Sequence, residues 1–344
     1  MEKLAVVLFN LGGPDSPKAV RPFLFNLFND PAIIGAPGPI RWALARFISK
    51  RRAPIAQQIY ARLGGKSPLL EQTQDQARAL EGVLGQGTRA FIAMRYWHPM
   101  TAETVAAVKA YAPDRIVLLP LYPQYSGATS GSSLKAWREE AARQGLRVPS
   151  VEVCCWPTAS GWIDSMAQRV AEAARAMDRP RVLFSAHGLP KKVIDRGDPY
   201  QWQVEQTAAR VVEKMALPGL DWQVCYQSRV GPLEWIGPST DAEIRRAGAD
   251  KVPVVVVPIA FVSEHSETLV ELDEEYRELA EHSGVPGFHR VPTVSSDPVF
   301  IDGLAALVRG ALAGTCSPCS QDGGRLCPGG LGVCPNRTES GPCR

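Results

Sequence analysis

The chain has 344 residues, of which 45% are hydrophobic and 21% are charged, and its formal net charge is +3. This length accommodates two domains with sizeable cores, and the small net charge gives no reason to expect a nucleic-acid partner. No apolar run reaches the roughly 18 residues of a membrane span, and the N-terminus enters a strand pattern without signal-peptide features, so we predict a cytoplasmic protein.

Apolar runs and amphipathic stretches alternate along the whole chain. The predicted strands cover residues 4–9, 89–95, 115–121, 151–155, 181–185, 222–226, 252–257 and 289–292. The predicted helices cover residues 20–29, 39–50, 72–84, 102–111, 133–144, 161–176, 200–215, 241–247 and 298–313, with a long helix after the strand at 252–257. Such alternation predicts an α/β fold with parallel sheets and helices on both faces.

The order of the elements suggests two Rossmann-like, doubly wound halves. We predict that residues 1–150 form the first half and residues 151–313 the second, followed by a cysteine-rich tail at 314–344. Ligands in such sheets bind beyond the carboxyl ends of the strands, so a cleft between the halves is the expected active site. The last helix is also able to pack back on the first half.

The unit at residues 251–281 has an uneven charge distribution. Its strand is followed by a helix for which Ser263 is the predicted N-cap. One helix face carries Leu269, Leu272, Tyr276 and Leu279. The opposite face carries glutamates at 264, 267, 271, 274, 275, 278 and 281. Like charges four residues apart cost roughly 0.2–0.5 kcal/mol per pair, so this face is explained either by bulk water or by a cation.

Two histidines stand where predicted strands end. His187 follows the strand at 181–185, and His265 lies beside Glu267 after the strand at 252–257. A single histidine at a strand end is as often structural as functional, but a histidine and a glutamate that meet at one sheet edge favour proton transfer or metal contact. The glycine pairs at 12–13 and 64–65 lack the spacing of dinucleotide or phosphate-binding loops.

Five of the eight cysteines, at 316, 319, 327, 334 and 343, stand near the C-terminus. In a reducing compartment such a group indicates bound metal rather than disulfides. The other three, Cys154, Cys155 and Cys225, lie in apolar strand-like runs, where we expect buried structural thiols.

Several long motifs resemble those of the ferrochelatases over roughly residues 3–313. They are LFNLGGPD, RRAPIAQQIYARLGGKSPL, MRYWHP, LPLYPQYS, SAHGLP, YQSRVGPLEWIGPSTD and PIAFVSEHSETLVELDEEY. The resemblance implies two Rossmann-like halves that hold protoporphyrin IX between them. It also implies insertion of Fe²⁺ with release of two protons, the terminal step of haem biosynthesis. A coproporphyrin or other tetrapyrrole substrate, and a non-catalytic haem- or iron-sensing protein, are the alternatives.

The resemblance also implies roles for individual residues. His187, Glu267 and His265 match the catalytic positions, with His187 either taking pyrrole protons or contacting the metal. Glu267, Glu271 and Glu275 match a proposed path for the substrate iron. The positions that match porphyrin-binding or cleft-lining residues are Leu11, Arg52, Tyr60, Ser67, Arg95, Tyr96, Tyr122 and Trp235.

Two further expectations follow from the resemblance. Residues 33–48 are apolar with a basic flank and match lips around the cleft that can rest on a membrane, in which case the protein is peripheral on the inner membrane; an ordinary core-facing helix is the alternative. Some ferrochelatases carry a 2Fe-2S cluster, here with Cys316, Cys319, Cys327 and Cys334 as candidate ligands and Cys343 as a weaker one. Zinc or a metal-free tail remain open, because thiolates serve either metal.

Overall fold

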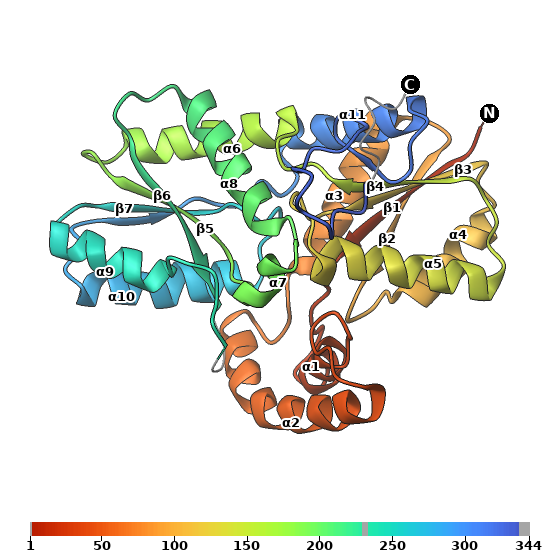
Figure 1. Cartoon of the computed structure of the whole chain (residues 1–344), viewed down its shortest axis with the longest axis horizontal. Helices are drawn as coiled ribbons and strands as arrows, with labels where there is room; N and C mark the ends of the chain where they lie inside the picture. Colours follow the sequence, from red (N-terminus) through yellow and green to blue (C-terminus); the bar gives the residue numbers. More distant parts are fainter. Residues whose placement is uncertain (1, 229–232, 337–344) are drawn as a thin grey trace.

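The computed structural model describes residues 2–228 and 233–336, which form two parallel sheets flanked by helices (Figure 1). The first sheet has the order β2-β1-β3-β4-β9 and the second the order β6-β5-β7-β8. The strands are β1 (Leu4–Asn10), β2 (Thr88–Met94), β3 (Arg115–Pro120), β4 (Ser150–Cys155), β5 (Arg181–His187), β6 (Asp221–Gln227), β7 (Val254–Pro258), β8 (Phe288–Arg290) and β9 (Cys319–Ser320). The predicted α/β fold class is therefore confirmed.

Helices cover both faces of each sheet (Figure 1). They are α1 (Val20–Phe28), α2 (Gly38–Arg62), α3 (Leu69–Leu84), α4 (Thr101–Tyr111), α5 (Ser132–Gln144), α6 (Ser160–Arg175), α7 (Lys191–Asp195), α8 (Tyr200–Met215), α9 (Thr240–Asp250), α10 (Tyr276–His282) and α11 (Pro298–Ala313). Two π-helical segments, η1 (Gly127–Gly131) and η2 (Glu267–Glu275), precede α5 and α10. The first follows the LPLYPQYS motif, and the second lies within the PIAFVSEHSETLVELDEEY motif.

One continuous apolar core joins the two halves, because α3, α6, α8 and α11 pack together on the same side of both sheets. Its centre is aromatic: the rings of Trp156 and Trp162 lie 6.1 Å apart, and Phe300 lies within 6.1 Å of both. The crossing of α6 and α11 requires glycine, since a Cβ on Gly161 would lie 2.6 Å from the Cα of Gly303. The last helix thus packs back on the first half, as predicted.

Strand β4 lies beyond the predicted boundary at residue 150, yet it pairs with β3 in the register Val117↔Val151. The first sheet therefore includes β4, and α6 is the crossover that leads to the second sheet. The tail adds β9 to the same edge, with Val153 opposite Cys319. The division into two halves remains a proposal, and the sheets place its boundary after β4.

Two helix boundaries differ from the prediction. Helix α2 does not end at residue 50 but continues to Arg62 through Pro54, a residue whose missing N–H usually interrupts a helix. The helix after β7 begins at Glu267 with Ser266 at its N-cap position, so Ser263 is not the cap. Instead the Ser263 hydroxyl donates to Gln76 Oε1 at 3.2 Å, which fixes the loop to α3.

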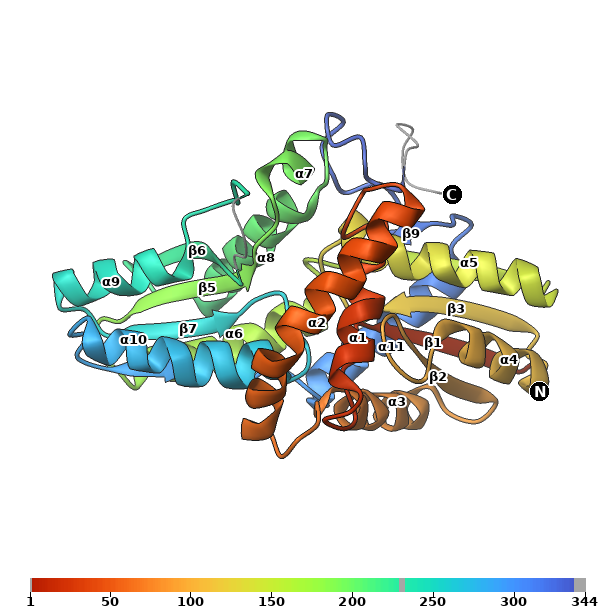
Figure 2. The ribbon, with the colours of Figure 1, turned by 90° about the horizontal axis from the view of Figure 1, so that it is seen from below.

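Helices α1 and α2 project from the first half beyond both sheets, and seen from below they lie across the boundary between the halves (Figure 2). The C-terminal end of α2 reaches η2, where Arg62 Nη1 and Glu274 Oε2 form an ion pair at 3.1 Å. The end of α2 thereby links the first half to η2, the segment that follows β7.

Candidate active site

The carboxyl ends of three neighbouring strands bring the predicted catalytic residues together. His187 is the last residue of β5 and stands in register with Gln227, the last residue of β6. Glu267 begins η2, which follows β7 on the other side of β5. His187 Nδ1 lies 3.1 Å from Glu267 Oε2, so residues 80 positions apart form a direct pair.

The two partners shift each other's pKa in opposite directions. Burial acts to raise the pKa of Glu267, but the charge of His187 and the hydrogen bond between the two side chains outweigh it and hold the pKa at about 2. Burial acts to lower the pKa of His187, yet Glu267 and, to a smaller extent, Glu271 raise it above its ordinary value. Glu267 is therefore a carboxylate at neutral pH.

This pairing determines which nitrogen of His187 is the base. A carboxylate only accepts hydrogen bonds, so Nδ1 must carry the proton that is donated to Glu267. In the neutral ring Nε2 then has the free lone pair, and the His187 side chain is 39% exposed. Glu267 thus orients the ring and favours proton uptake at Nε2.

A second carboxylate, Glu271, lies one turn further along η2. Ser228 holds it through its backbone N–H at 2.8 Å and its hydroxyl at 2.5 Å, from a backbone with φ +60°. Burial and the charge of Glu267 raise the pKa of Glu271, while the hydrogen bonds from Ser228 oppose the rise. Glu275 is exposed, so the line from Glu267 through Glu271 to Glu275 runs from the site to solvent.

His265 occupies a different place from His187. Its Nδ1 accepts the backbone N–H of Glu267 at 3.1 Å, and its ring meets Phe261 edge-on with centroids 4.7 Å apart. Burial lowers its pKa, so the ring is neutral. This geometry suits a residue that positions Glu267 at the start of η2 better than a residue that exchanges protons.

Glu264, which the sequence places on the acidic face, points inward instead. Its carboxylate accepts Arg290 Nη1 at 2.9 Å and the Thr293 backbone N–H at 2.9 Å. Both charged side chains are nearly buried, at 8% and 14% exposed. The acidic stripe therefore begins at Glu267, because residue 264 precedes the helix and serves to anchor the loop after β7.

Several predicted porphyrin-binding residues lie in the layer formed by α1, α2 and the loops after β1 and β2. Tyr60 on α2 is buried beside Glu267: burial raises its pKa to about 12, a hydrogen bond from Ser266 opposes the rise and the charge of Glu267 adds to it. Leu11 packs in the same apolar group as Tyr60. Ser67 is buried against Gly13, where a Cβ would lie 2.4 Å from the serine Oγ.

Arg95 and Tyr96 are bound to a carboxylate that the sequence analysis missed, Asp30 at the end of α1. Asp30 Oδ2 accepts Arg95 Nη2 at 2.7 Å, the Tyr96 hydroxyl at 2.9 Å and the Ser132 hydroxyl at 2.5 Å. Burial would raise the pKa of Asp30, but hydrogen bonds from Ser132 and Ala32 and the charge of Arg95 lower it. The Arg95 guanidinium therefore already has a carboxylate partner.

The remaining predicted positions are less constrained. Arg52 on α2 is partly exposed and makes no ion pair within the described part of the chain. Trp235 pairs through its backbone with Pro190, which places it next to the turn after His187. Tyr122 follows β3, and burial raises its pKa. Residues 229–232 of the YQSRVGPLEW motif lie outside the described residues.

Comparison with known proteins decides the family. The ferrochelatase family model matches residues 3–312. The chain belongs to the ferrochelatase family. It is 55% identical over 344 residues to the ferrochelatase of Caulobacter vibrioides strain NA1000, covering 98% of both chains, and 48% identical over 311 residues to that of Pelagibacter ubique, covering 89% of this chain and 90% of the relative.

Solved structures of two chelatases share the fold of this chain. SirB from Bacillus subtilis with Fe³⁺ matches with a TM-score of 0.54 and 13% identity, covering 91% of this chain and 96% of that chain. The cobalt complex of the sirohydrochlorin chelatase SirB from the subspecies spizizenii matches with a TM-score of 0.52 and 12% identity, covering 90% and 95%.

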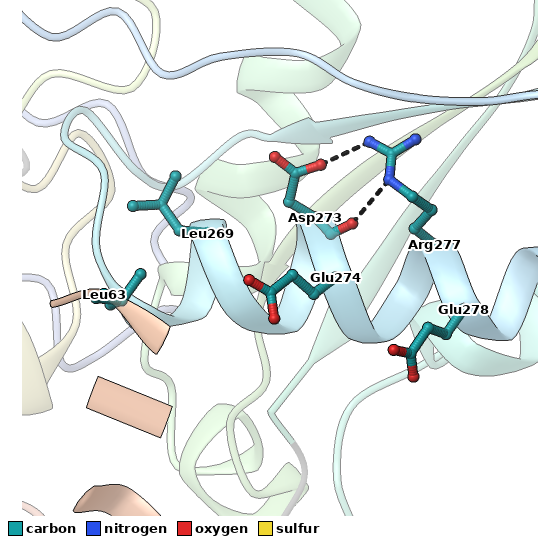
Figure 3. Close-up of a pocket in the computed structure, with 6 residues that line it drawn as sticks. All are labelled: Leu63, Leu269, Asp273, Glu274, Arg277 and Glu278. Carbon is teal, nitrogen blue, oxygen red and sulfur yellow. Dashed lines mark hydrogen bonds and ion pairs between the residues drawn. The ribbon is translucent and has the colours of Figure 1, made fainter. Parts of the chain in front are cut away.

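A hollow of about 570 Å³ lies between the end of α2 and the outer side of η2 and α10 (Figure 3). It is lined by Leu63, Leu269, Asp273, Glu274, Arg277 and Glu278. Arg277 donates to Asp273 Oδ1 at 2.7 Å, so the only guanidinium among these lining residues is neutralised (Figure 3). Such an acidic surface would repel the carboxylates of a porphyrin, and we do not place the substrate of this ferrochelatase-family chain there.

The family match ends at residue 312, so the cysteine-rich tail lies beyond it. Cys319, Cys327 and Cys334 are buried free thiols, whereas Cys316 is disulfide-bonded, contrary to its prediction as a metal ligand. Cys343 lies outside the described residues. Within residues 2–228 and 233–336, no group of three or more histidine, cysteine or acidic side chains is arranged to hold a metal ion.

One cysteine that the sequence analysis treated as structural joins this group. Cys155 on β4 lies close enough to Cys319, Cys327 and Cys334 for their charges to interact, and each interaction acts to raise a thiol pKa. The Tyr125 ring packs between β4 and the tail residues Leu326 and Val333. These three free thiols of the tail therefore lie near a fourth thiol, that of Cys155 on β4.

Proposed function

We propose that this chain is a ferrochelatase that inserts Fe²⁺ into protoporphyrin IX, releasing two protons and forming protohaem. The observation that supports this best is the pair of His187 and Glu267 at the carboxyl ends of the second sheet. The pair supplies a base and a carboxylate at one point, which is what metallation of a porphyrin requires.

We assign the first role to His187 Nε2. Each pyrrole N–H that is replaced by a bond to iron must give up its proton, and Nε2 has the free lone pair that takes it. The ring proton on Nδ1 stays with Glu267, whose negative charge stabilises the imidazolium that forms. Because two protons leave for each iron, His187 must pass on the first, and Glu271 and Glu275 provide oxygen acceptors toward solvent.

The same carboxylates suit the incoming substrate iron. Fe²⁺ has to shed water before it meets the ring nitrogens, and carboxylate and imidazole are transient ligands that bind it without trapping it. Glu275 is exposed, Glu271 is partly buried and Glu267 contacts His187, so a cation that follows this line loses water in steps. This would explain why η2 carries acids along its length.

On the porphyrin side, we propose Arg52 as the cation for a propionate, since it has no carboxylate partner among the described residues. Leu11, Tyr60, Tyr122 and Trp235 would supply apolar and aromatic walls. Tyr96 and Ser67 are buried and would support these walls from behind. Arg95 is held by Asp30, so we propose that it shapes the site and does not serve as the main propionate anchor.

Three substrate arms separate this function from its alternatives. Purified protein is incubated without oxygen with Fe²⁺ and either protoporphyrin IX, coproporphyrin or sirohydrochlorin, and the absorption spectrum is followed. The proposal predicts haem formation fastest with protoporphyrin. If coproporphyrin or sirohydrochlorin is turned over faster than protoporphyrin, that tetrapyrrole replaces protoporphyrin as the proposed substrate. If all three tetrapyrroles bind and none is metallated, a non-catalytic binding protein is favoured.

We further propose that the protein is cytoplasmic and rests on the inner membrane through the start of α2. Ile40, Trp42 and Phe47 are between 51% and 59% exposed, which is unusual for large apolar side chains. Arg46 lies over the Trp42 ring and Arg51 over the Phe47 ring, so cations flank the apolar surface as they do in interfacial helices. No helix of the described residues is long and apolar enough to cross a bilayer.

Vesicle sedimentation tests this contact. Replacing Trp42 and Phe47 by Ser should reduce binding to anionic vesicles by at least about tenfold, since each buried side chain contributes ~1.5–3 kcal/mol. Trp222→Ser is the control, because Trp222 is also exposed but belongs to the second half. Equal binding of both variants would contradict a role for α2.

Finally, we propose that the tail holds a metal, most simply a 2Fe-2S cluster, through Cys155, Cys319, Cys327 and Cys334. The chemistry of these donors fits, because buried free thiols in a reducing cytosol are typical ligands of iron–sulfur clusters and zinc. A bound metal would cross-link the tail to β4. Metal and acid-labile sulfide analysis of the purified protein distinguishes the cluster, about two irons and two sulfides per chain, from one zinc or no metal.

A further inference from the structure

A fully buried glutamine stands where the tail, the first half and the second half meet. Gln203 on α8 is 0% exposed. Its Oε1 accepts the backbone N–H of Tyr125 at 2.7 Å, and its Nε2 donates to Cys327 Sγ at 3.1 Å. Tyr125 follows β3 in the first half and Cys327 belongs to the tail, so one side-chain amide links three segments.

The orientation of this amide is fixed by its partners. A backbone N–H can only donate, so the oxygen of Gln203 must face Tyr125 and the NH₂ group must face the sulfur. A donor of a fully buried amide is therefore directed at a cysteine sulfur.

Sulfur in a neutral thiol is a weak acceptor, and a buried polar group that lacks a good partner costs about 1–3 kcal/mol. The same N–H groups make strong, charge-assisted hydrogen bonds when the sulfurs are thiolates, as metal ligands must be. Residues that hydrogen-bond to metal ligands orient the ligands and tune the metal.

We propose that Gln203 is a positioning residue for the metal of the tail, holding the sulfur of Cys327 in place and tying the metal to the contact between the two halves. This inference rests on the proposed tail metal. It predicts that Gln203 affects how firmly the metal is held, while His187 and Glu267 act independently of it.

The test compares Gln203→Glu, which keeps the size and the acceptor but removes both donors, with Gln206→Glu on the same helix, whose side chain is partly exposed. Gln203→Met keeps the volume without adding charge and serves as a second variant if Gln203→Glu does not fold. Each purified protein is treated with excess EDTA, and the release of tail metal is followed by element analysis and visible absorption, with circular dichroism as the folding control.

The expected result is release about 10–100-fold faster in Gln203→Glu and Gln203→Met than in the wild type, the size typical for residues that support metal ligands. Gln206→Glu should match the wild type. Equal release rates in all folded variants would overturn the role of Gln203 while leaving the tail metal intact. Wild-type protein purified without tail metal would overturn both proposals.

Discussion

Replacing Glu267 by Gln should reveal the coupling to His187 through its pH dependence. The pKa of His187 is raised, so its contribution to stability is fully present below 6.5 and is lost as pH rises through the folded-state value. The pKa of Glu267 is lowered from 4.5 to about 2, so its contribution is present above 4.5 and is lost as pH falls toward 2. The pair is therefore most stabilising between about 4.5 and 6.5.

The magnitude follows from the shift of Glu267. A change from 4.5 to about 2 corresponds to about 3 kcal/mol, at ~1.4 kcal/mol per pKa unit. The side chains of His187 and Glu267 are 39% and 31% exposed, so solvent screens their attraction and about 1–2 kcal/mol should remain. The isosteric amide of the variant keeps the volume but removes the charge.

Urea unfolding of the wild type and Glu267→Gln at about pH 5.5 and pH 9 measures this coupling. The difference in unfolding free energy between the two proteins should be about 1–2 kcal/mol larger at the lower pH. The rising limb of the pH–rate profile should also move to lower pH in the variant, because His187 loses the charge that raises its pKa. The reasoning would be refuted if the difference in unfolding free energy between the two proteins were the same at both pH values and the rising limb of the pH–rate profile did not move.

Three further outcomes are expected. Glu278→Gln should leave the rate of iron insertion within about twofold of the wild type, whereas Glu267→Gln should lower it about 10²–10⁴-fold. Equal losses in both variants would mean that the glutamates of this helix only face solvent. Cys155→Ser should lose the tail metal on element analysis while Cys225→Ser keeps it, and retention in both would exclude Cys155 as a ligand. Asp30→Asn should lower the melting temperature and raise the porphyrin KM, because Arg95 loses its partner; an unchanged KM would make Asp30 purely structural.

The sequence was sufficient for the fold class because strand and helix periodicities are local properties. The buried run at 252–257 and the amphipathic stretch after it correspond to β7 and η2, and Leu272 and Tyr276 are buried as expected. The edge at which β4 pairs could not be predicted, since its register with β3 depends on the crossover of α6. The passage of α2 through Pro54 likewise depends on the layer it forms with α1.

For the candidate site, the meeting of His187 and Glu267 could be predicted because both follow strands of one sheet. Asp30, Cys155 and Gln203 were missed because each is a single residue in an ordinary helical or strand pattern. Their importance depends on partners that are far away along the chain, such as Tyr96, which is 66 residues from Asp30, and Cys334, which is 179 residues from Cys155. Only the packed structure brings these partners together.

The central claim is that Nε2 of His187 takes the pyrrole protons during iron insertion. Anaerobic single-turnover absorption spectroscopy with Fe²⁺ and protoporphyrin IX tests it directly in the wild type, His187→Ala and the control His282→Ala, with porphyrin fluorescence reporting binding. The account predicts haem formation in the wild type and in His282→Ala, and bound but unmetallated porphyrin in His187→Ala. Haem formation at the wild-type rate in His187→Ala would contradict it.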